Sequence, residues 1–260
     1  MDLNLKDRVI VVTGGAKGIG ASIVRSCGRE GALPVIFDRD GPATEEMQCE
    51  LGREGVPSEA VVCELTDFSN SRRALQDLGQ RLGHIDALVN NAGVNDGVGL
   101  ERGGPEQFAA SLERNLVHYY AMAQAALPFL KQSHGSIVNI GSKVAVTGQG
   151  GTSGYAAAKG AILESTGAWA AELAKYGIRV NTVVPAEVRT PLYEQWLRKF
   201  ENPDARLRVI LAKIPLEGRM TEPDEIAAMV LFLVSPKSAG ITGRQFFVDG
   251  GYVHLDRSLT

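Results

Sequence analysis

The chain has 260 residues, of which 44% are hydrophobic and 22% are charged, and its formal net charge is −3. These values are ordinary for an α/β protein with one core, so we expect a single domain over residues 1–260. Scattered basic residues exclude a nucleic-acid footprint and a basic membrane surface. The chain lacks both a run of 18 apolar residues and a signal-peptide pattern, so we expect a cytoplasmic location and small-molecule partners.

The three cysteines, Cys27, Cys49 and Cys63, contain no CxxC pair, and the four histidines lack the spacings of metal ligands. An odd number of cysteines without a secretory signal indicates reduced thiols with a packing role. We therefore expect no metal site.

Seven short apolar runs rich in β-branched residues indicate strands, most of them buried on both faces. They are Val9–Thr13, Pro34–Asp38, Ala60–Cys63, Ala87–Asn90, Ser136–Ile140, Arg179–Val184 and Gln245–Asp249. Stretches with apolar residues at helical spacing lie between them, one of which runs from Leu112 to Ala123. The alternation predicts right-handed crossovers and a doubly wound parallel sheet, an α/β fold.

The pattern changes after Pro185, where Thr190 to Lys213 forms two short helical pieces broken at Asn202-Pro203, before a last helix over Pro223–Val234. An insertion at the carboxyl end of a strand is well placed to cover a ligand. We therefore expect a helical substrate lid over about residues 190–213.

The first strand leads into a glycine-rich turn over Thr13–Gly20. Glycines at a strand-to-helix turn let the backbone approach a pyrophosphate, and the following helix offers free N–H groups. A glycine-rich turn without a ligand is the alternative, but its place after the first strand favours a dinucleotide. Gly14, Lys17, Gly18 and Ile19 are the expected contacts.

Asp38 closes the second strand, roughly 20 residues after the glycines, where a carboxylate can bind both hydroxyls of the adenosine ribose and repel a 2′-phosphate. This favours NAD. NADP stays possible, because Lys17 and Arg39 could pair with a 2′-phosphate and Asp38 could simply cap a turn. Further along, Asn90-Asn91-Ala92-Gly93 ends the fourth strand, where an Asn side chain can tie neighbouring strand ends together, or where the motif is simply an Asn-Gly-type turn. Asn91 is an expected cofactor contact.

Tyr155 and Lys159 are four residues apart, which places both side chains on one helix face. The spacing of these two residues is by itself weak evidence for a catalytic role. Its chemistry is specific, however, because a phenol with a pKa near 10 becomes a usable base only when a neighbouring ammonium stabilises the phenolate.

Two polar residues could complete this unit. Ser142, at the end of the fifth strand, could orient a substrate oxygen, although a strand-end cap is an equal alternative. Asn115, in a predicted long helix, could hold a water that links Lys159 to solvent, or it could be an incidental polar residue.

Together these elements resemble the short-chain dehydrogenase/reductase family over essentially the whole chain. The motifs that carry the resemblance are TGxxxGxG at Thr13–Gly20, NNAG at Asn90–Gly93, Asn115, Ser142, YxxxK at Tyr155–Lys159, the stretch Pro185–Thr190 and Asp249-Gly250-Gly251.

The resemblance implies a Rossmann fold, a homotetramer and a catalytic tetrad of Asn115, Ser142, Tyr155 and Lys159. It also implies that Lys159 binds the nicotinamide ribose and that Val188 and Thr190 contact the carboxamide.

Two positions depart from the family pattern. Glu64 stands where the family usually has Asp for the adenine edge, and we expect Glu64 and the adjacent Leu65 to contact the cofactor. Pro185-Ala186-Glu187 replaces the usual Pro-Gly, which puts a carboxylate beside the substrate space.

Polar residues are expected around that space: Asn95, Asp96, Lys143, Gln149 and Glu187. A polyol needs such partners, since each buried hydroxyl left unpaired costs roughly 1–3 kcal/mol, although Asp96 and Lys143 could simply solvate loops. Trp196 in the lid could cover an apolar sugar face or pack internally.

Several strings also resemble the bacterial L-fucose dehydrogenases of this family, among them Asn91–Gly97, Val146–Gly150, Pro185–Val188 and Tyr252–Arg257. This resemblance implies oxidation of C1 of L-fucose or a similar aldopyranose to a lactone. Tyr155 would remove the hydroxyl proton, Ser142 would hold the oxygen, and Glu187, Gln149 and Asn95 would fix the ring hydroxyls.

Two other functions stay open. One is a 3-oxoacyl-thioester reductase or hydroxysteroid dehydrogenase of the same family. The other is a nucleotide-binding sensor without turnover, against which the complete tetrad argues, since a sensor does not need Tyr155 and Lys159.

Overall fold

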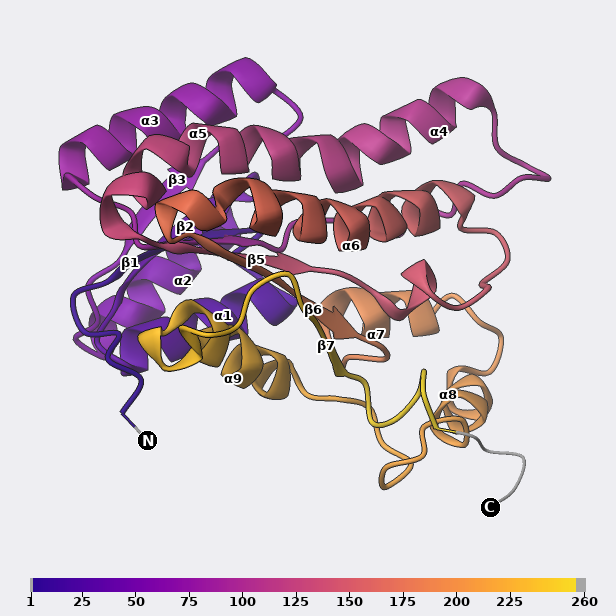
Figure 1. Ribbon diagram of the computed structural model, residues 1–260. Helices are drawn as coiled ribbons and strands as arrows, with labels where there is room; N and C mark the ends of the chain where they lie inside the picture. Colours follow the sequence, from indigo (N-terminus) through magenta and orange to yellow (C-terminus); the bar gives the residue numbers. More distant parts are fainter. Residues whose placement is uncertain (1, 256–260) are drawn as a thin grey trace.

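A seven-stranded parallel sheet forms the centre of the computed structural model, which describes residues 2–255 (Figure 1). The strands are β1 (Val9–Thr13), β2 (Leu33–Asp38), β3 (Glu59–Val62), β4 (Ala87–Asn90), β5 (Ser136–Ile140), β6 (Arg179–Pro185) and β7 (Gln245–Val248). Their order in the sheet is β3-β2-β1-β4-β5-β6-β7. The doubly wound α/β fold predicted from the alternation is confirmed, and the strand ends lie within one residue of those expected.

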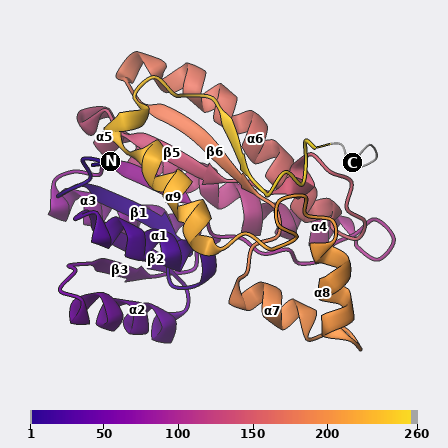
Figure 2. The ribbon, with the colours of Figure 1, turned by 90° about the horizontal axis from the view of Figure 1, so that it is seen from below.

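Helices cover both faces of this sheet. They are α1 (Gly18–Arg29), α2 (Gly41–Arg53), α3 (Phe68–Leu82), α4 (Pro105–Leu112), α5 (His118–Ser133), α6 (Ser153–Leu173), α7 (Pro191–Leu197), α8 (Pro203–Leu211) and α9 (Pro223–Val234). In Figures 1 and 2, α1, α2 and α9 lie on one face, and α3, α5 and α6 lie on the other.

The apolar strand residues divide between these two layers. In β1, Ile10 and Val12 belong to the core cluster under α1 and α9, whereas Val9 and Val11 belong to the cluster under α3 and α5. Successive side chains of a strand point to opposite faces, so a strand between two helical layers must be apolar throughout. This is why the sequence shows continuous apolar runs.

The order of the strands reverses at β1, which lies between β2 and β4. Connections leave the two strands in opposite directions there and open a crevice at their carboxyl ends. Any ligand of this fold is expected in that crevice.

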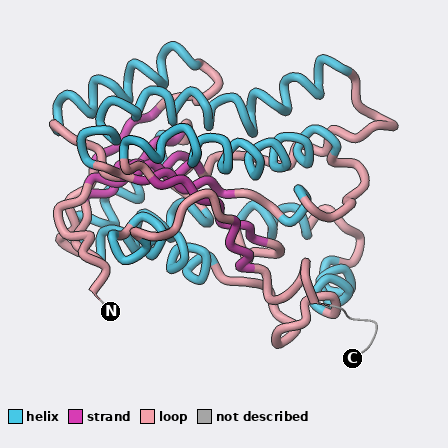
Figure 3. The backbone as a smooth tube through the Cα atoms, viewed as in Figure 1, coloured by secondary structure: helices cyan, strands magenta, loops and turns pink. Residues whose placement is uncertain are grey.

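The segment after β6 forms the two short helices that the sequence predicted, α7 and α8, which Figure 3 shows as separate helices. The break between them covers residues 198–202, and α8 begins at Pro203, directly after its N-cap Asn202. Thr190 and Asn202 cap them by accepting hydrogen bonds from Tyr193 N and Ala205 N, at 3.2 and 2.9 Å. Figure 2 shows both helices beside the carboxyl ends of the strands.

One helix differs from expectation. The apolar spacing from Leu112 onward predicts a continuous helix, but a π-helical turn over Glu113–Val117 separates α4 from α5. Its wider hydrogen bonding inserts a residue into the helical pattern and changes which side chains face the sheet. Asn115 lies in this turn.

Within residues 2–255, no helix is both long enough and apolar enough to cross a membrane. Asp256 and Arg257, the last two residues of the predicted tail string, lie outside the described residues.

Candidate functional site

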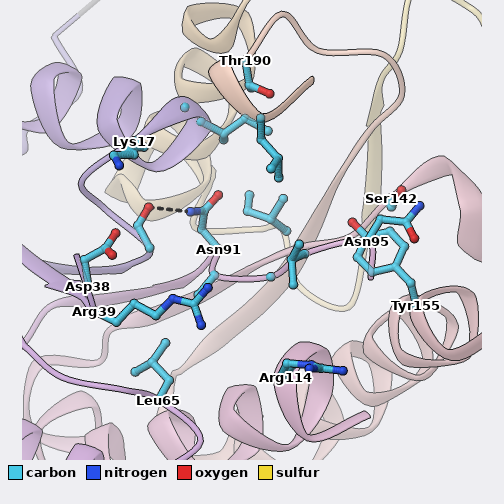
Figure 4. A pocket seen from close by; sticks show the side chains of 18 of the residues that line it. Lys17, Asp38, Arg39, Leu65, Asn91, Asn95, Arg114, Ser142, Tyr155 and Thr190 are labelled. Carbon is cyan, nitrogen blue, oxygen red and sulfur yellow. Dashed lines mark hydrogen bonds between the residues drawn. The ribbon is translucent and has the colours of Figure 1, made fainter. Parts of the chain in front are cut away.

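A cavity of about 570 Å³ opens at the carboxyl ends of the strands, where the order reverses (Figure 4). Every residue predicted to contact the cofactor lines it. These residues are Gly14, Lys17, Gly18, Ile19, Asp38, Arg39, Glu64, Leu65, Asn91, Tyr155, Lys159, Val188 and Thr190.

The glycine-rich turn forms one wall with its bare backbone. Gly14 and Gly18 have φ angles of +63° and +56°, which other L-residues rarely adopt. A Cβ on Gly20 would lie 2.0 Å from the carbonyl oxygen of Gly14, so only glycine permits this turn. The amino end of α1 at Gly18 has no side-chain cap, which leaves N–H groups free for an anion.

Asn91 ties this wall to the end of β4. Its Nδ2 donates to the carbonyl oxygens of Thr13 and Gly14, at 2.9 and 3.1 Å, and Figure 4 shows it reaching towards the turn. The Thr13 hydroxyl accepts in return from the backbone N–H groups of Asn91 and Ala92. The motif was predicted to join neighbouring strand ends through an Asn side chain, and Asn91 makes such contacts between the ends of β1 and β4.

The end of the cavity beside β2 is acidic. Asp38 accepts hydrogen bonds from Ala16 N at 3.1 Å and from Asp40 N at 3.0 Å, which fixes its carboxylate against the turn. Both cations that could attract a phosphate are already paired, Lys17 with Asp40 and Arg39 with Glu64. This end of the cavity therefore carries three carboxylates and only two cations, and both cations are paired.

Tyr155 and Ser142 line the opposite end of the cavity. Ser142 follows β5, and its hydroxyl hydrogen-bonds to the phenol of Tyr155 on α6. Burial raises the pKa of Tyr155 to about 12, and the hydrogen bond from Ser142 opposes that rise because it stabilises the phenolate.

Lys159 lies one turn further along α6 and is 2% exposed. Its Nζ donates to the Tyr119 hydroxyl at 2.9 Å and to the carbonyl oxygen of Ile140 at 2.8 Å. It lies 5.6 Å from the centroid of the Tyr155 ring. Since none of these groups is a carboxylate, burial lowers the pKa of Lys159 to about 7.

Asn115 is fully buried and does not reach the cavity surface with its side chain. Its Oδ1 accepts from Val94 N at 2.7 Å, and its Nδ2 donates to Ser111 O at 3.0 Å. A Cβ on Gly93 would lie 3.0 Å from that Oδ1 and 3.5 Å from Lys159 Nζ. Asn115 thus holds the loop after β4 against Lys159.

Of the residues predicted to contact substrate, Asn95, Ser142 and Tyr155 line the cavity, whereas Lys143, Gln149, Glu187 and Trp196 are absent from its described lining. Gln149 is exposed. Trp196 packs within the lid against Tyr193 and Phe200, with ring centroids 5.2 and 4.8 Å apart. Substrate contact by these four residues stays a prediction, while Asp96 pairs with Arg114 at 2.8 Å.

Lys143, which directly follows Ser142 in the chain, forms a nearly buried ion pair with Glu187. Lys143 Nζ also lies 4.0 Å from the centroid of the Tyr252 ring. The hydroxyl of Tyr193 in the lid hydrogen-bonds to Glu187, and burial with this carboxylate raises the pKa of Tyr193. We call these four residues the latch, because they join the ends of β5 and β6 to the lid and the C-terminal segment.

Sequence reasoning missed Arg114, His118 and Tyr193, which line the cavity, and Tyr119, which holds Lys159. Tyr119 follows Asn115 by four residues, a helical spacing that offered a weak signal. The others could not be found, because the π-helical turn and the lid geometry decide which way they point.

Within residues 2–255, no group of three or more His, Cys, Asp or Glu side chains is arranged to hold a metal ion. Cys27 and Cys63 are buried free thiols, and burial raises the pKa of Cys27 to about 12 and that of Cys63 to about 11.

A family model described as enoyl-(acyl carrier protein) reductase matches residues 14–253. The chain belongs to the short-chain dehydrogenase/reductase family. Its members are oxidoreductases that use NAD(P)H and act on small molecules, so the sequence resemblance is confirmed at this level.

Relatives in this family differ in what they act on. The chain is 35% identical over 254 residues to the 3-oxoacyl-[acyl-carrier-protein] reductase FabG of Thermotoga maritima, covering 96% of this chain and 100% of that protein. It is 36% identical over 246 residues to the L-fucose dehydrogenase of Bos taurus, covering 94% and 88%.

Two solved structures extend this comparison. The dehydrogenase Cj0485 is 43% identical with a TM-score of 0.94, and the match covers 100% of this chain and 99% of that one. The ligand-free aldohexose dehydrogenase AldT of Thermoplasma acidophilum is 26% identical with a TM-score of 0.90, covering 100% and 99%.

Proposed function

We propose that this enzyme oxidises C1 of an aldopyranose such as L-fucose to the lactone, with NAD as the cofactor. The observation that carries the proposal is the meeting of Ser142, Tyr155 and Asn95 at one end of a cavity whose other end fits a dinucleotide. When bound, the nicotinamide ring accepts the hydride that C1 releases.

Tyr155 is the proposed proton acceptor for the C1 hydroxyl, and Ser142 holds the oxygen of that hydroxyl. Burial opposes charge on both Tyr155 and Lys159, so each is neutral more readily than in water. A phenolate on Tyr155 and an ammonium on Lys159 stabilise each other in this buried place, so charging one favours charging the other. Asn115 positions the loop that packs against Lys159.

NAD is proposed over NADP because of the acidic end of the cavity. A 2′-phosphate there would face Asp38, Asp40 and Glu64, while Lys17 and Arg39 are already paired with two of these carboxylates. A phosphate placed beside these carboxylates would be repelled, because like charges close together are unfavourable. We expect Asp38→Ser to lower the affinity for NAD and raise that for NADP, measured by calorimetric titration.

An aldose is proposed over a long acyl chain or steroid because polar side chains surround the reacting end. Asn95, Tyr193 and Gln195 line the cavity along with Tyr155. Sugar hydroxyls need such partners, and an apolar substrate would leave them unpaired. The L-fucose and aldohexose dehydrogenases among the relatives also support a sugar.

The test compares initial rates of NADH formation with L-fucose, D-arabinose and L-galactose, and with a steroid and a β-hydroxyacyl thioester. We expect turnover with at least one aldose and none with the apolar substrates. Absence of aldose oxidation with either NAD or NADP would refute the proposal.

A 3-oxoacyl-thioester reductase is the second candidate, because the FabG match covers 96% of this chain at 35% identity, beside 36% for the L-fucose dehydrogenase. It predicts oxidation of NADPH in the presence of an acetoacetyl thioester. The same enzyme preparation can be assayed both ways, so one experiment separates the two functions.

A further inference from the structure

Tyr119 is a buried tyrosine that the proposed chemistry does not use. It lies in the first turn of α5, is 0% exposed and is absent from the described lining of the cavity. Its hydroxyl contacts two residues that do line the cavity, Lys159 and Ile140. Tyr119 therefore acts on a bound ligand only through these neighbours.

Three hydrogen bonds join Tyr119, Lys159 and Ile140 in a closed triangle. Lys159 Nζ donates to the Tyr119 hydroxyl at 2.9 Å and to the carbonyl oxygen of Ile140 at 2.8 Å, and the hydroxyl donates to the same carbonyl oxygen at 3.2 Å. Since the carbonyl oxygen takes the hydroxyl hydrogen, the phenol oxygen presents its lone pairs to Nζ. Both oxygens accept from Lys159, an arrangement that favours the ammonium over the neutral amine.

The triangle also orients the ammonium. An ammonium has three hydrogens, and two of them point to α5 and to the end of β5. The third is left for the side of the cavity where Tyr155 lies, with its ring centroid 5.6 Å from Nζ. The direction of this third hydrogen depends on the hydroxyl of Tyr119.

The fold fixes the place of Tyr119. Nδ2 of Asn90, at the end of β4, donates to the carbonyl oxygen of Tyr119 at 3.3 Å. The π-helical turn directly before α5 inserts one residue, which rotates the side chains after it by about 100° around the helix axis. The turn therefore decides which residue of α5 faces Lys159.

The titratable groups around Lys159 are Tyr155 on the same helix and His118 and Tyr119 on α5. Burial and the charge of Lys159 lower the pKa of His118 to about 4, so its ring is neutral near pH 7. Burial raises the pKa of Tyr119 well above its usual range, so this phenol keeps its hydrogen. No carboxylate contacts Lys159 within residues 2–255, so the oxygens of the triangle are what reduces the cost of its charge.

We infer that Tyr119 is a positioning residue of this site: its hydroxyl favours the ammonium form of Lys159 and directs that ammonium at Tyr155. This rests on the proposed roles of Tyr155 and Lys159 but not on the choice of aldose. The first measurement below needs no substrate, so it can fail while aldose oxidation stands, and the reverse.

The first measurement titrates Lys159 itself. The ¹³Cε resonance of Lys159 in lysine-labelled protein, identified by its absence in Lys159→Met, is followed from about pH 5 to about pH 9 in wild type and two variants. Tyr119→Phe removes only the hydroxyl. Tyr176→Phe is the matched control, because Tyr176 lies beyond the far end of α6 and its ring also lies against a lysine, with Lys131 Nζ 4.1 Å from the centroid.

We expect the titration midpoint of Lys159 near pH 7 in wild type and about one pH unit lower in Tyr119→Phe, because a hydrogen bond to the charged form is lost. Tyr176→Phe should leave the midpoint unchanged. Equal midpoints in wild type and Tyr119→Phe, or the same fall in Tyr176→Phe, would overturn the inference.

The second measurement separates positioning from simple damage to the site. It follows kcat against pH with NAD and the substrate that wild type oxidises fastest. Near pH 5.5 both chains hold Lys159 as the ammonium, so the ratio of wild type to Tyr119→Phe should be close to one. Near pH 8.5 the variant holds about tenfold less ammonium, so the ratio should approach tenfold.

A ratio of kcat values that is the same at every pH would show that Tyr119 has a structural role only, and would contradict the inference. If wild type oxidises none of the substrates, the proposed function fails, while the titration of Lys159 still decides the role of Tyr119.

Discussion

Lys159 combines two properties that rarely occur together: it is nearly fully buried and it has no carboxylate partner within residues 2–255. Hydrogen bonds to Tyr119 and Ile140 hold its Nζ, yet they do not compensate the charge. Burial therefore lowers the pKa of Lys159 to about 7, from 10.5 in an unfolded chain. A pKa that differs between the folded and the unfolded chain makes the free energy of unfolding depend on pH.

The direction of this pH dependence follows from which state, folded or unfolded, binds more protons. Between pH 7 and 10.5 the unfolded chain holds the Lys159 proton more often than the folded chain, so the free energy of unfolding rises with pH there. This contribution is lost as the pH falls from 10.5 towards 7. The raised pKa of Tyr155 acts in the opposite direction, but only above pH 10.

We therefore expect Lys159→Met to flatten the pH dependence of the unfolding free energy between pH 7.5 and 9.5. The wild-type slope from this residue is up to about 1.4 kcal/mol per pH unit. Urea denaturation at several pH values measures it, and Tyr155→Phe is the control that keeps the slope. An unchanged slope in Lys159→Met would contradict the assigned burial effect.

Among the elements, the latch joins α7 of the lid to the ends of β5 and β6. Lys143 and Glu187 form a nearly buried ion pair, and Tyr193 of α7 hydrogen-bonds to Glu187. A buried ion pair contributes little net stability, but removal of one partner leaves the other charge uncompensated.

Glu187→Leu is therefore expected to destabilise the protein by about 3 kcal/mol, whereas Lys143→Met/Glu187→Leu should cost clearly less. The measurement is the midpoint of urea denaturation for wild type, each single variant and the double variant. Additive losses in the double variant would show that the two charges do not depend on each other.

The latch also shows where prediction from sequence ended. The sequence predicts substrate contacts for Glu187 and Lys143 because each follows a strand that ends at the site. Their pairing with each other depends on tertiary distances that no local pattern contains. The π-helical turn had the same effect at Arg114 and His118, since an inserted residue shifts which side chains face the cavity.

Across the whole molecule, most features that could be predicted depend on residues that lie close together in the chain. The glycine turn and Asp38 lie at strand ends, and Tyr155 and Lys159 share one face of a helix. The carboxyl ends of parallel strands meet at one edge of the sheet, so a common site at that edge could be predicted. The division of β1 between two core layers also follows from its continuous apolar run. The order of the strands in the sheet was not predicted, because it depends on which strands pair across long connections.

The oligomeric state is also a property of the whole molecule. The homotetramer implied by the family resemblance stays our proposal, and exposed apolar side chains on α4, α5 and the turn between them support it: Phe108 is 37% exposed, Val117 36% and Tyr120 56%. Clustered exposed apolar groups are typical of interfaces. Sedimentation velocity should give the mass of four chains, and Tyr120→Glu should shift it to smaller species. A monomeric wild type at micromolar concentration would refute this proposal.

In the proposed reaction, Tyr155 accepts the proton while C1 of the sugar gives up hydride. The most direct test supplies L-fucose with deuterium at C1, together with NAD, and follows the label by mass spectrometry. We predict deuterium in the reduced cofactor and a lactone product with wild type, and neither with Tyr155→Phe, which should still bind NAD with nearly unchanged affinity. Label that stays on the sugar in wild type, or label transfer that persists in Tyr155→Phe, would contradict the account.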